Sequence, residues 1–239
     1  MTPLAELLAT RIRLQSEFAE TEVPYGEAYA VKAAAGWSPA ELTEVGATEP
    51  TPATAHPAAQ GQGQAAAAAA GDSGTVRAGY THSTYLVMLH AGPVPAGGPA
   101  DEVDLDAIRI PLARRWRGLL PDVDDEVIRH LVDRREARRR GADVVRFLGA
   151  RTEEGEVASW ADLYLDPATG TAQIEDLITS EAHLRRGYAD AVLTTALRLA
   201  ADKDCETRFL TADATGWPRH WYERRGFSVI GQSHCFERG

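Results

Sequence analysis

The fold class follows from one segment, Gln173-Ile174-Glu175-Asp176-Leu177-Ile178-Thr179-Ser180-Glu181-Ala182-His183-Leu184-Arg185-Arg186-Gly187-Tyr188-Ala189-Asp190. It begins as a strand and continues through a polar turn. Apolar residues then recur at three- and four-residue steps up to position 200, which predicts a helix that begins at Arg185 or Arg186. The first-turn amides of such a helix lack acceptors and carry partial positive charge. Gly187 lets a ligand approach this backbone and the two arginines add cations, so we predict a phosphate or pyrophosphate site.

The segment Arg-Arg-Gly-Tyr-Ala, residues 185–189, matches neither of the two common phosphate loops, because the glycine spacing of nucleotide triphosphatases and of dinucleotide-binding folds is absent. It resembles the acetyl-CoA signature of the GNAT superfamily of N-acetyltransferases, Gln/Arg-x-x-Gly-x-Gly/Ala. Gly187 and Ala189 take the glycine and small-residue positions. Leu184 takes the Gln/Arg position and departs from the signature, which is tolerable where backbone amides do most of the binding.

A second motif is Trp221-Tyr222-Glu223-Arg224-Arg225-Gly226-Phe227, which resembles the Tyr-x-x-x-Gly-Phe of the same superfamily. The expected order of elements is also similar to the GNAT order. After two helices come strands at 144–150, 158–165 and 171–179, the helix from 185 to 201, a strand at 207–212, a helix at 217–224 and two closing strands. The resemblance therefore covers about residues 100–239 and implies an α/β fold, a mixed sheet with helices on both faces, of the GNAT-like acyl-CoA N-acyltransferase type.

The Pro/Gly-rich segment 91–100 is the best domain boundary in the chain. It divides an N-terminal domain, residues 1–95, from the GNAT-like domain, residues 100–239. The segment Arg77-Ala78-Gly79-Tyr80-Thr81-His82 echoes Arg224-Arg225-Gly226-Phe227-Ser228-Val229, which suggests a tandem arrangement with a degenerate N-terminal GNAT-like unit. The low-complexity segment 48–74 fits a mobile linker or a surface helix, and the sequence does not decide between them.

Composition narrows the class of protein. The 239 residues are 44% hydrophobic and 25% charged, with a net charge of −10, which argues against partners such as nucleic acid or an anionic membrane. No run is long enough to span a membrane, and the N-terminus lacks the features of a signal peptide. With only two cysteines, we expect no disulfide framework and a cytoplasmic location. The seven histidines lack ligand spacing, so no metal is expected. Arg138, Arg139 and Arg140 indicate a solvated helix face.

The resemblance implies roles for the binding residues. The backbone of Leu177, Ile178 and Thr179 would pair with the pantetheine arm of acetyl-CoA as an added strand pairs with a sheet edge. An amide near Leu177 would stabilise the oxyanion that forms on the thioester. The pyrophosphate would be held by the amides of the signature segment, whose residues are Leu184, Arg185, Arg186, Gly187, Tyr188 and Ala189.

The resemblance also nominates catalytic residues. Tyr222 would be the general acid that returns a proton to the CoA thiolate, and the alternative is that it only packs beside the pantetheine. Strand alternation puts Glu175 and Asp176 on opposite faces, and it puts Glu175 on the face of Gln173, the position often acidic in histone-type members. Glu175 is therefore our candidate base. A polar residue that tunes the acceptor site, or a chain of waters, is the alternative.

We therefore expect an N-acetyltransferase that moves an acetyl group from acetyl-CoA to a primary amine by direct transfer. The acceptor is a small-molecule or protein amine, and overall acidity favours a basic one. One alternative is a non-catalytic acyl-CoA-binding or regulatory module. Another is that the chain mainly forms an oligomer or partner interface, and a homodimer is one assembly that the sequence leaves open.

Overall fold

The structure is a computed structural model, and it describes residues 30–33, 80–140, 142 and 144–238. Most of the expected N-terminal domain therefore lies outside the described residues, and so do the segment 48–74 and the first half of the echoed motif. The elements in chain order are β1 (Ala30–Ala33), β2 (Tyr80–His90), β3 (Asp101–Val103), α2 (Leu105–Leu119), α3 (Asp125–Asp133), the 3-10 helix η2 (Arg134–Arg140), β4 (Val144–Arg151), β5 (Val157–Asp166), β6 (Thr171–Thr179), the 3-10 helix η3 (Glu181–His183), α4 (Tyr188–Ala201), β7 (Thr207–Asp213), α5 (Pro218–Glu223) and β8 (Phe227–Arg238).

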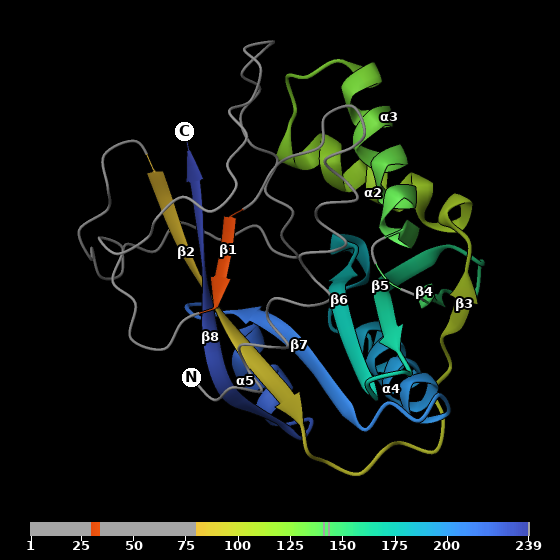
Figure 1. Cartoon of the computed structure of the whole chain (residues 1–239). Coiled ribbons are helices and arrows are strands. Elements are labelled where there is room, and N and C mark those ends of the chain that lie inside the picture. The colour runs from red at the N-terminus through yellow and green to blue at the C-terminus, as the bar shows by residue number, and fades with distance from the viewer. Residues whose placement is uncertain (1–29, 34–79, 141, 143, 239) are drawn as a thin grey trace.

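The described strands form one mixed sheet in the order β1-β8-β2-β7-β6-β5-β4-β3 (Figure 1). Strands β6 and β7 are parallel, and helix α4 is the crossover that joins them. The other neighbouring strands of the described sheet run antiparallel. This is the mixed α/β sheet that the sequence predicts.

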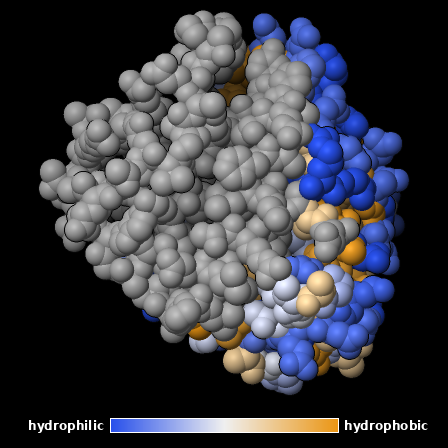
Figure 2. All heavy atoms as spheres, in the orientation of Figure 1, coloured by the Kyte–Doolittle hydropathy of each residue, from blue (hydrophilic) through white to orange (hydrophobic). Residues whose placement is uncertain are grey.

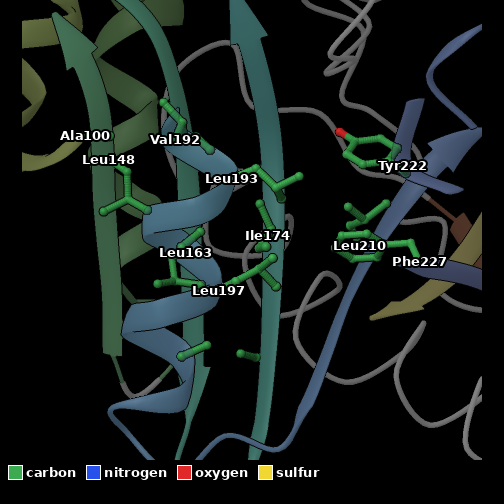
Figure 3. Packing of buried hydrophobic residues seen from close by; sticks show 14 of the residues in the cluster. Ala100, Leu148, Leu163, Ile174, Val192, Leu193, Leu197, Leu210, Tyr222 and Phe227 are labelled. Atoms are coloured by element: carbon green, nitrogen blue, oxygen red, sulfur yellow. The ribbon is translucent and has the colours of Figure 1, made fainter. Parts of the chain in front are cut away.

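Helices cover both faces of the sheet because successive strand residues point to opposite sides. On β4, Leu148 belongs to the apolar cluster that includes Val192 and Leu193 of α4, whereas the preceding Phe147 belongs to the cluster of α2 and α3. Figure 3 shows the α4 side, where leucine and valine side chains of the helix lie against those of β4, β5 and β6. On the other side, the outward surface of α2 and α3 is mostly hydrophilic (Figure 2). The strand that leads into α4 is thus covered on both faces.

Strand β2 lies inside this sheet, between β7 and β8 (Figure 1). It pairs with β7 from Tyr85 to Leu89 and with β8 from Tyr80 to His90. The Pro/Gly segment 91–100 therefore does not separate β2 from the sheet of the C-terminal part, although the rest of the expected division falls on residues outside the described ranges. The expectation of two closing strands is wrong, since the chain closes with the single strand β8. Strand β2, from earlier in the sequence, lies next to β8 instead.

Candidate active site

The pairing of β6 with β7 stops half-way along both strands. Their register covers Thr171–Ile174 of β6, opposite residues 207–210 of β7. Beyond this point β7 continues to pair with β2, and β6 continues to pair with β5. Among the described residues, no strand pairs with residues 175–179 on the side that faces β7. The backbone N–H and C=O groups of this open edge can therefore accept an extended ligand as an added strand.

Strand β6 contains a bulge at the start of the open edge. Glu175 lies opposite Asp162 of β5, and Ile178 lies opposite Trp160, so β6 has one residue more than β5 between these pairs. Asp176, inside the bulge, has a positive φ of 51°. Such a conformation is uncommon for a residue with a side chain, and it bends the strand.

The bulge corrects the expected orientation of Asp176. Its carboxylate and that of Asp162 bind the same guanidinium, that of Arg138. Asp162 is the cross-strand neighbour of Glu175, and residues directly opposite each other share a face. Asp176 and Glu175 therefore lie on the same side of the sheet, because the extra residue cancels one step of the strand alternation.

Four charged side chains hold the bulge against η2, and we call Arg135, Arg138, Asp162 and Asp176 the bulge cluster. Arg138 Nη1 lies 2.7 Å from Asp162 and 2.5 Å from Asp176. Arg135 lies 2.6 Å from Asp162 through Nη2 and 3.3 Å from Asp176 through Nη1. The side chain of Asp162 is 0% exposed and that of Asp176 8%. The expectation of a solvated helix face is therefore wrong for Arg138, because its guanidinium forms ion pairs with two buried carboxylates.

The electrostatics of Asp176 follow from these contacts. Burial raises the pKa of this carboxyl, but the charges of Arg138 and Arg135 outweigh burial, so the pKa of Asp176 lies below its usual value. A third guanidinium, that of Arg115 on α2, acts in the same direction. Asp176 is therefore ionised at neutral pH and anchors the open edge through charge.

The loop after β6 leads into α4 through two left-handed residues. Arg185 has a φ of 62° and Gly187 a φ of 86°, and α4 begins at Tyr188. The prediction that the helix begins at Arg185 or Arg186 is thus wrong by two or three residues, because a positive φ takes the backbone off the helical path. Gly187 is the N-cap, a role for which glycine suits the left-handed conformation.

The amino end of α4 presents amides without partners inside the helix. The first bond of the helix runs from Ala191 N to Gly187 O at 3.0 Å, and the N-cap offers no side-chain hydrogen bond. The amides of residues 188–190 therefore precede the first intrahelical bond. A Cβ placed on Gly187 would meet no heavy atom within 4 Å, and Arg185 and Arg186 are both exposed. The space, the amides and the positive charge fit an anion such as pyrophosphate.

His183 supports this loop from within the protein. Its ring packs edge-on against Tyr188, with 5.9 Å between the centroids. Its Nε2 lies 3.5 Å from Glu156 in the turn between β4 and β5, and its side chain is largely buried. His183 is thus part of the packing that positions the loop before α4.

Tyr222, on α5, lies in the same apolar cluster as the α4 face of the sheet. Leu177 of the open edge and Tyr188 of α4 also pack against this cluster. Trp221 and Phe227 pack edge-on against the Tyr222 ring at centroid distances of 5.0 and 5.6 Å. In Figure 3 the hydroxyl points away from Phe227, towards β6. Burial and the nearby charge of Glu175 raise the pKa of Tyr222, so its hydroxyl keeps its proton at neutral pH.

The expected common face of Gln173 and Glu175 is confirmed by a hydrogen bond. Gln173 Nε2 donates to Glu175 Oε2 at 2.5 Å. The charge of Glu175 also contributes to the raised pKa of Tyr222, so the two side chains interact electrostatically. Glu175, the first residue of the open edge, and Tyr222 of α5 are thus the candidate acid–base pair of the site.

The family comparison agrees with this geometry. Residues 113–227 match the family model described as the acetyltransferase (GNAT) family. The chain carries a GNAT acetyltransferase domain. The GNAT domain makes the protein an acyltransferase enzyme, and the matched range includes both sequence motifs. No curated protein matches the chain in sequence.

Solved structures similar to the chain include GNAT acetyltransferases. One is a putative acetyltransferase of the GNAT family from Novosphingobium aromaticivorans, with 19% identity over 68% of this chain and 69% of that chain and a TM-score of 0.47. An acetyltransferase of the GNAT family from Colwellia psychrerythraea has 13% identity over 66% and 57%, with a TM-score of 0.48. A ribosomal-protein-alanine N-acetyltransferase from Brucella melitensis has 20% identity over 55% and 93%, with a TM-score of 0.41. Similarity at this level says nothing about the acceptor.

Two classes of feature do not occur in the described ranges of the chain. No group of three or more histidine, cysteine, aspartate or glutamate side chains there is arranged to hold a metal ion. None of the helices there has the length and apolar character needed to cross a membrane.

The sequence alone does not predict the bulge cluster or the hydrogen bond from Gln173 to Glu175. Asp162 sits in a long apolar strand and is fully buried, and a charged residue in such a strand was the available signal. The matching signal on the other side was the arginine run of η2. The two segments are distant in the sequence, so only the folded chain pairs them.

Proposed function

We propose that the GNAT domain transfers an acetyl group from acetyl-CoA directly to a primary amine. The observation that carries this proposal is the open edge of β6, residues 175–179, which leads through a short loop to the uncapped amino end of α4. An extended arm that ends in a pyrophosphate is complementary to this arrangement, since it can pair with a strand edge at one end and bind helix amides at the other.

Binding would use mainly backbone groups. The pantetheine arm would pair along Leu177, Ile178 and Thr179, and an amide near Leu177 would stabilise the charge on the thioester oxygen during transfer. The pyrophosphate would lie against the amides from Gly187 to Asp190, with Arg185 and Arg186 adding charge. Leu184, which is exposed, would contribute its backbone alone, and so the departure of its side chain from the family signature is tolerated.

Acetyl-CoA would supply the activated thioester, and two side chains would move the protons. Glu175 would take a proton from the acceptor ammonium, directly or through water, which leaves the nitrogen lone pair free to form the new C–N bond. As the C–S bond breaks, its electron pair stays on sulfur. Tyr222 would donate its proton to that sulfur and regain one from the nitrogen, which loses its second proton, directly or through water, as it becomes an amide. The raised pKa of the buried phenol supports a protonated resting state.

The proposal extends to the acceptor and the surroundings of the protein. The net charge of −10 favours a basic amine on a small molecule or a protein. A cytoplasmic location suits a chain with two cysteines, of which Cys205 is a buried free thiol. A homodimer is compatible with this activity and is not required for it.

Calorimetric titration with acetyl-CoA, followed by thiol release in the presence of a panel of amines, tests the proposal. We expect one binding site per chain and thiol release with at least one amine. Two sites per chain would show a second CoA site outside the GNAT domain. Binding without thiol release would favour an acyl-CoA-binding or regulatory module, and the absence of binding would overturn the proposal.

A further inference from the structure

Gln173 is a polar residue in an apolar part of the sheet. Its register partners are Tyr164 on β5 and Phe209 on β7, two rings that belong to one apolar cluster with Val87 of β2. Gln173 is 0% exposed. Its Nε2 donates to Glu175, and its Oε1 has no hydrogen-bond partner.

This arrangement is unfavourable for stability. A buried polar atom that has lost its water without gaining a partner costs about 1–3 kcal/mol. The single hydrogen bond to Glu175 offsets part of that cost, and an apolar side chain of the same size would avoid the cost altogether. Residues that reduce stability in this way are found where a site needs them.

The effect of Gln173 falls on Glu175. Gln173 lies in the last paired stretch of β6, where the backbone is held by strands on both sides, whereas Glu175 begins the open edge. A neutral N–H donor fixes the direction of a neighbouring carboxylate and stabilises its ionised form. A carboxylate at position 173 would have the opposite effect, because two acids that share a site bind a proton more tightly.

We propose that Gln173 is a positioning residue that holds Glu175 oriented and ionised for the acceptor amine. Gln173 does not itself touch the reacting atoms. This inference rests on the proposed function, since it needs Glu175 to take the proton of the amine. Gln173 occupies a position that is often acidic in histone-type members. The inference is that it serves there as the hydrogen-bond donor to the base Glu175, and that its lack of a carboxylate is not a loss of function.

The test compares Gln173→Met and Gln173→Glu with Thr171→Val. Thr171 is buried on the same face of the same strand, and its hydroxyl donates to Thr169, away from Glu175. Each variant is measured for its free energy of unfolding, its affinity for acetyl-CoA, and the pH profile of kcat/KM for the best amine found for the wild type.

For Gln173→Met we expect a free energy of unfolding equal to or above that of the wild type. We expect its acetyl-CoA affinity to stay within about twofold of the wild type and its kcat/KM to be about tenfold lower. The acid limb of the pH profile moves to higher pH, because Glu175 loses the donor that favours its ionised form. Gln173→Glu moves the acid limb further and recovers activity at high pH. Thr171→Val leaves the limb in place.

The outcomes separate the inference from the proposed function. If the wild type transfers acetyl groups and both Gln173 variants keep its pH profile, the inference is wrong and the function stands. The same holds if Glu175→Gln has full activity. If the wild type acetylates no amine, both fall. Should Gln173→Met fail to fold, the near-isosteric Gln173→Glu decides, and an unmoved acid limb in that variant overturns the inference.

Discussion

Asp162 and Asp176 lie on the two neighbouring strands of a β-bulge and bind one guanidinium, that of Arg138. Asp162 occupies the regular, fully buried part of β5, whereas Asp176 sits at a positive φ inside the bulge. The shared arginine thus links the bulged segment of β6 to the regular strand β5. The open edge of β6 begins beside the bulge cluster, so its position depends on charged side chains that are not proposed to contact the substrate.

The bulge cluster predicts a large stability effect for Asp176→Asn. Removing this charge leaves Arg135 and Arg138 buried with one carboxylate, and breaking a buried pair costs about 3–5 kcal/mol. Urea unfolding measures the loss. The matched control is Asp202→Asn, which removes a pair with Arg198 whose aspartate is 53% exposed, and it should cost less than about 1 kcal/mol. Equal losses in the two variants would contradict the role of the cluster.

The difference in stability between the wild type and Asp176→Asn should depend on pH. The pKa of Asp176 is lowered in the folded state, so its contribution to stability is present above the unfolded value of about 4 and is lost as pH falls through the folded value. The difference in unfolding free energy between the wild type and Asp176→Asn should be constant from about pH 6 to about pH 8 and shrink in acid. A difference that grows in acid would mean that another group dominates.

At the amino end of α4, Gly187→Glu should abolish acetyl-CoA binding without unfolding the domain. The new carboxylate would stand where the pyrophosphate is proposed to bind, and no atom clashes with a Cβ there. The cost to folding is the positive φ alone, about 1–2 kcal/mol. Gly170→Glu, also at a positive φ but in the turn before β6, is the control and should bind normally. Unchanged affinity in Gly187→Glu would refute the site.

For Tyr222→Phe we expect turnover to fall at least about tenfold while acetyl-CoA affinity changes little, because the phenol is needed only when the thiolate leaves. The control is Tyr188→Phe, which removes the hydroxyl of a partly buried tyrosine but keeps the backbone amide proposed to bind pyrophosphate, and it should change neither quantity. Since burial raises the pKa of Tyr222, no alkaline fall in rate from this group should appear below about pH 10. Matching losses in affinity and turnover would indicate packing instead.

The segment before β3 predicts a contrast between adjacent glycines. A Cβ on Gly98 would lie 2.6 Å from Thr195 Oγ1 and 2.9 Å from Ala191 O, both on α4, whereas a Cβ on Gly97 meets nothing within 4 Å. Gly98→Ala should therefore lower the unfolding free energy by about 1–3 kcal/mol, and Gly97→Ala should leave it unchanged or slightly raised. Similar values for the two would show that the segment moves away from the helix freely.

Local patterns predicted most elements of residues 101–238. Strand β6 has the expected limits, and β4, β5, β7, α4 and α5 lie within a few residues of theirs. These elements follow from the spacing of apolar side chains, which is a local property. The start of α4 differs from the predicted one because Arg185 has a left-handed conformation, for which an arginine gives no signal in the sequence.

The features that escaped prediction depend on contacts between distant residues. The bulge at Asp176 is stabilised by arginines of η2, and an alternation rule applied to β6 alone has no means to include them. The place of β2 in the sheet likewise depends on β7 and β8, more than a hundred positions later in the chain. The family resemblance and strand alternation nominate Tyr222 and Glu175 as candidates, but the hydrogen bond from Gln173 depends on the folded strand.

The position of β2 also has a consequence for synthesis. A ribosome releases this strand long before β7 and β8, and in the described sheet those two strands pair with β2 and not with each other. Half of the sheet therefore cannot close until the last strand has been made, a non-local order that slows folding. A shortened protein that lacks β2 would expose at once the edges of β7 and β8 that pair with it, and it should aggregate during expression.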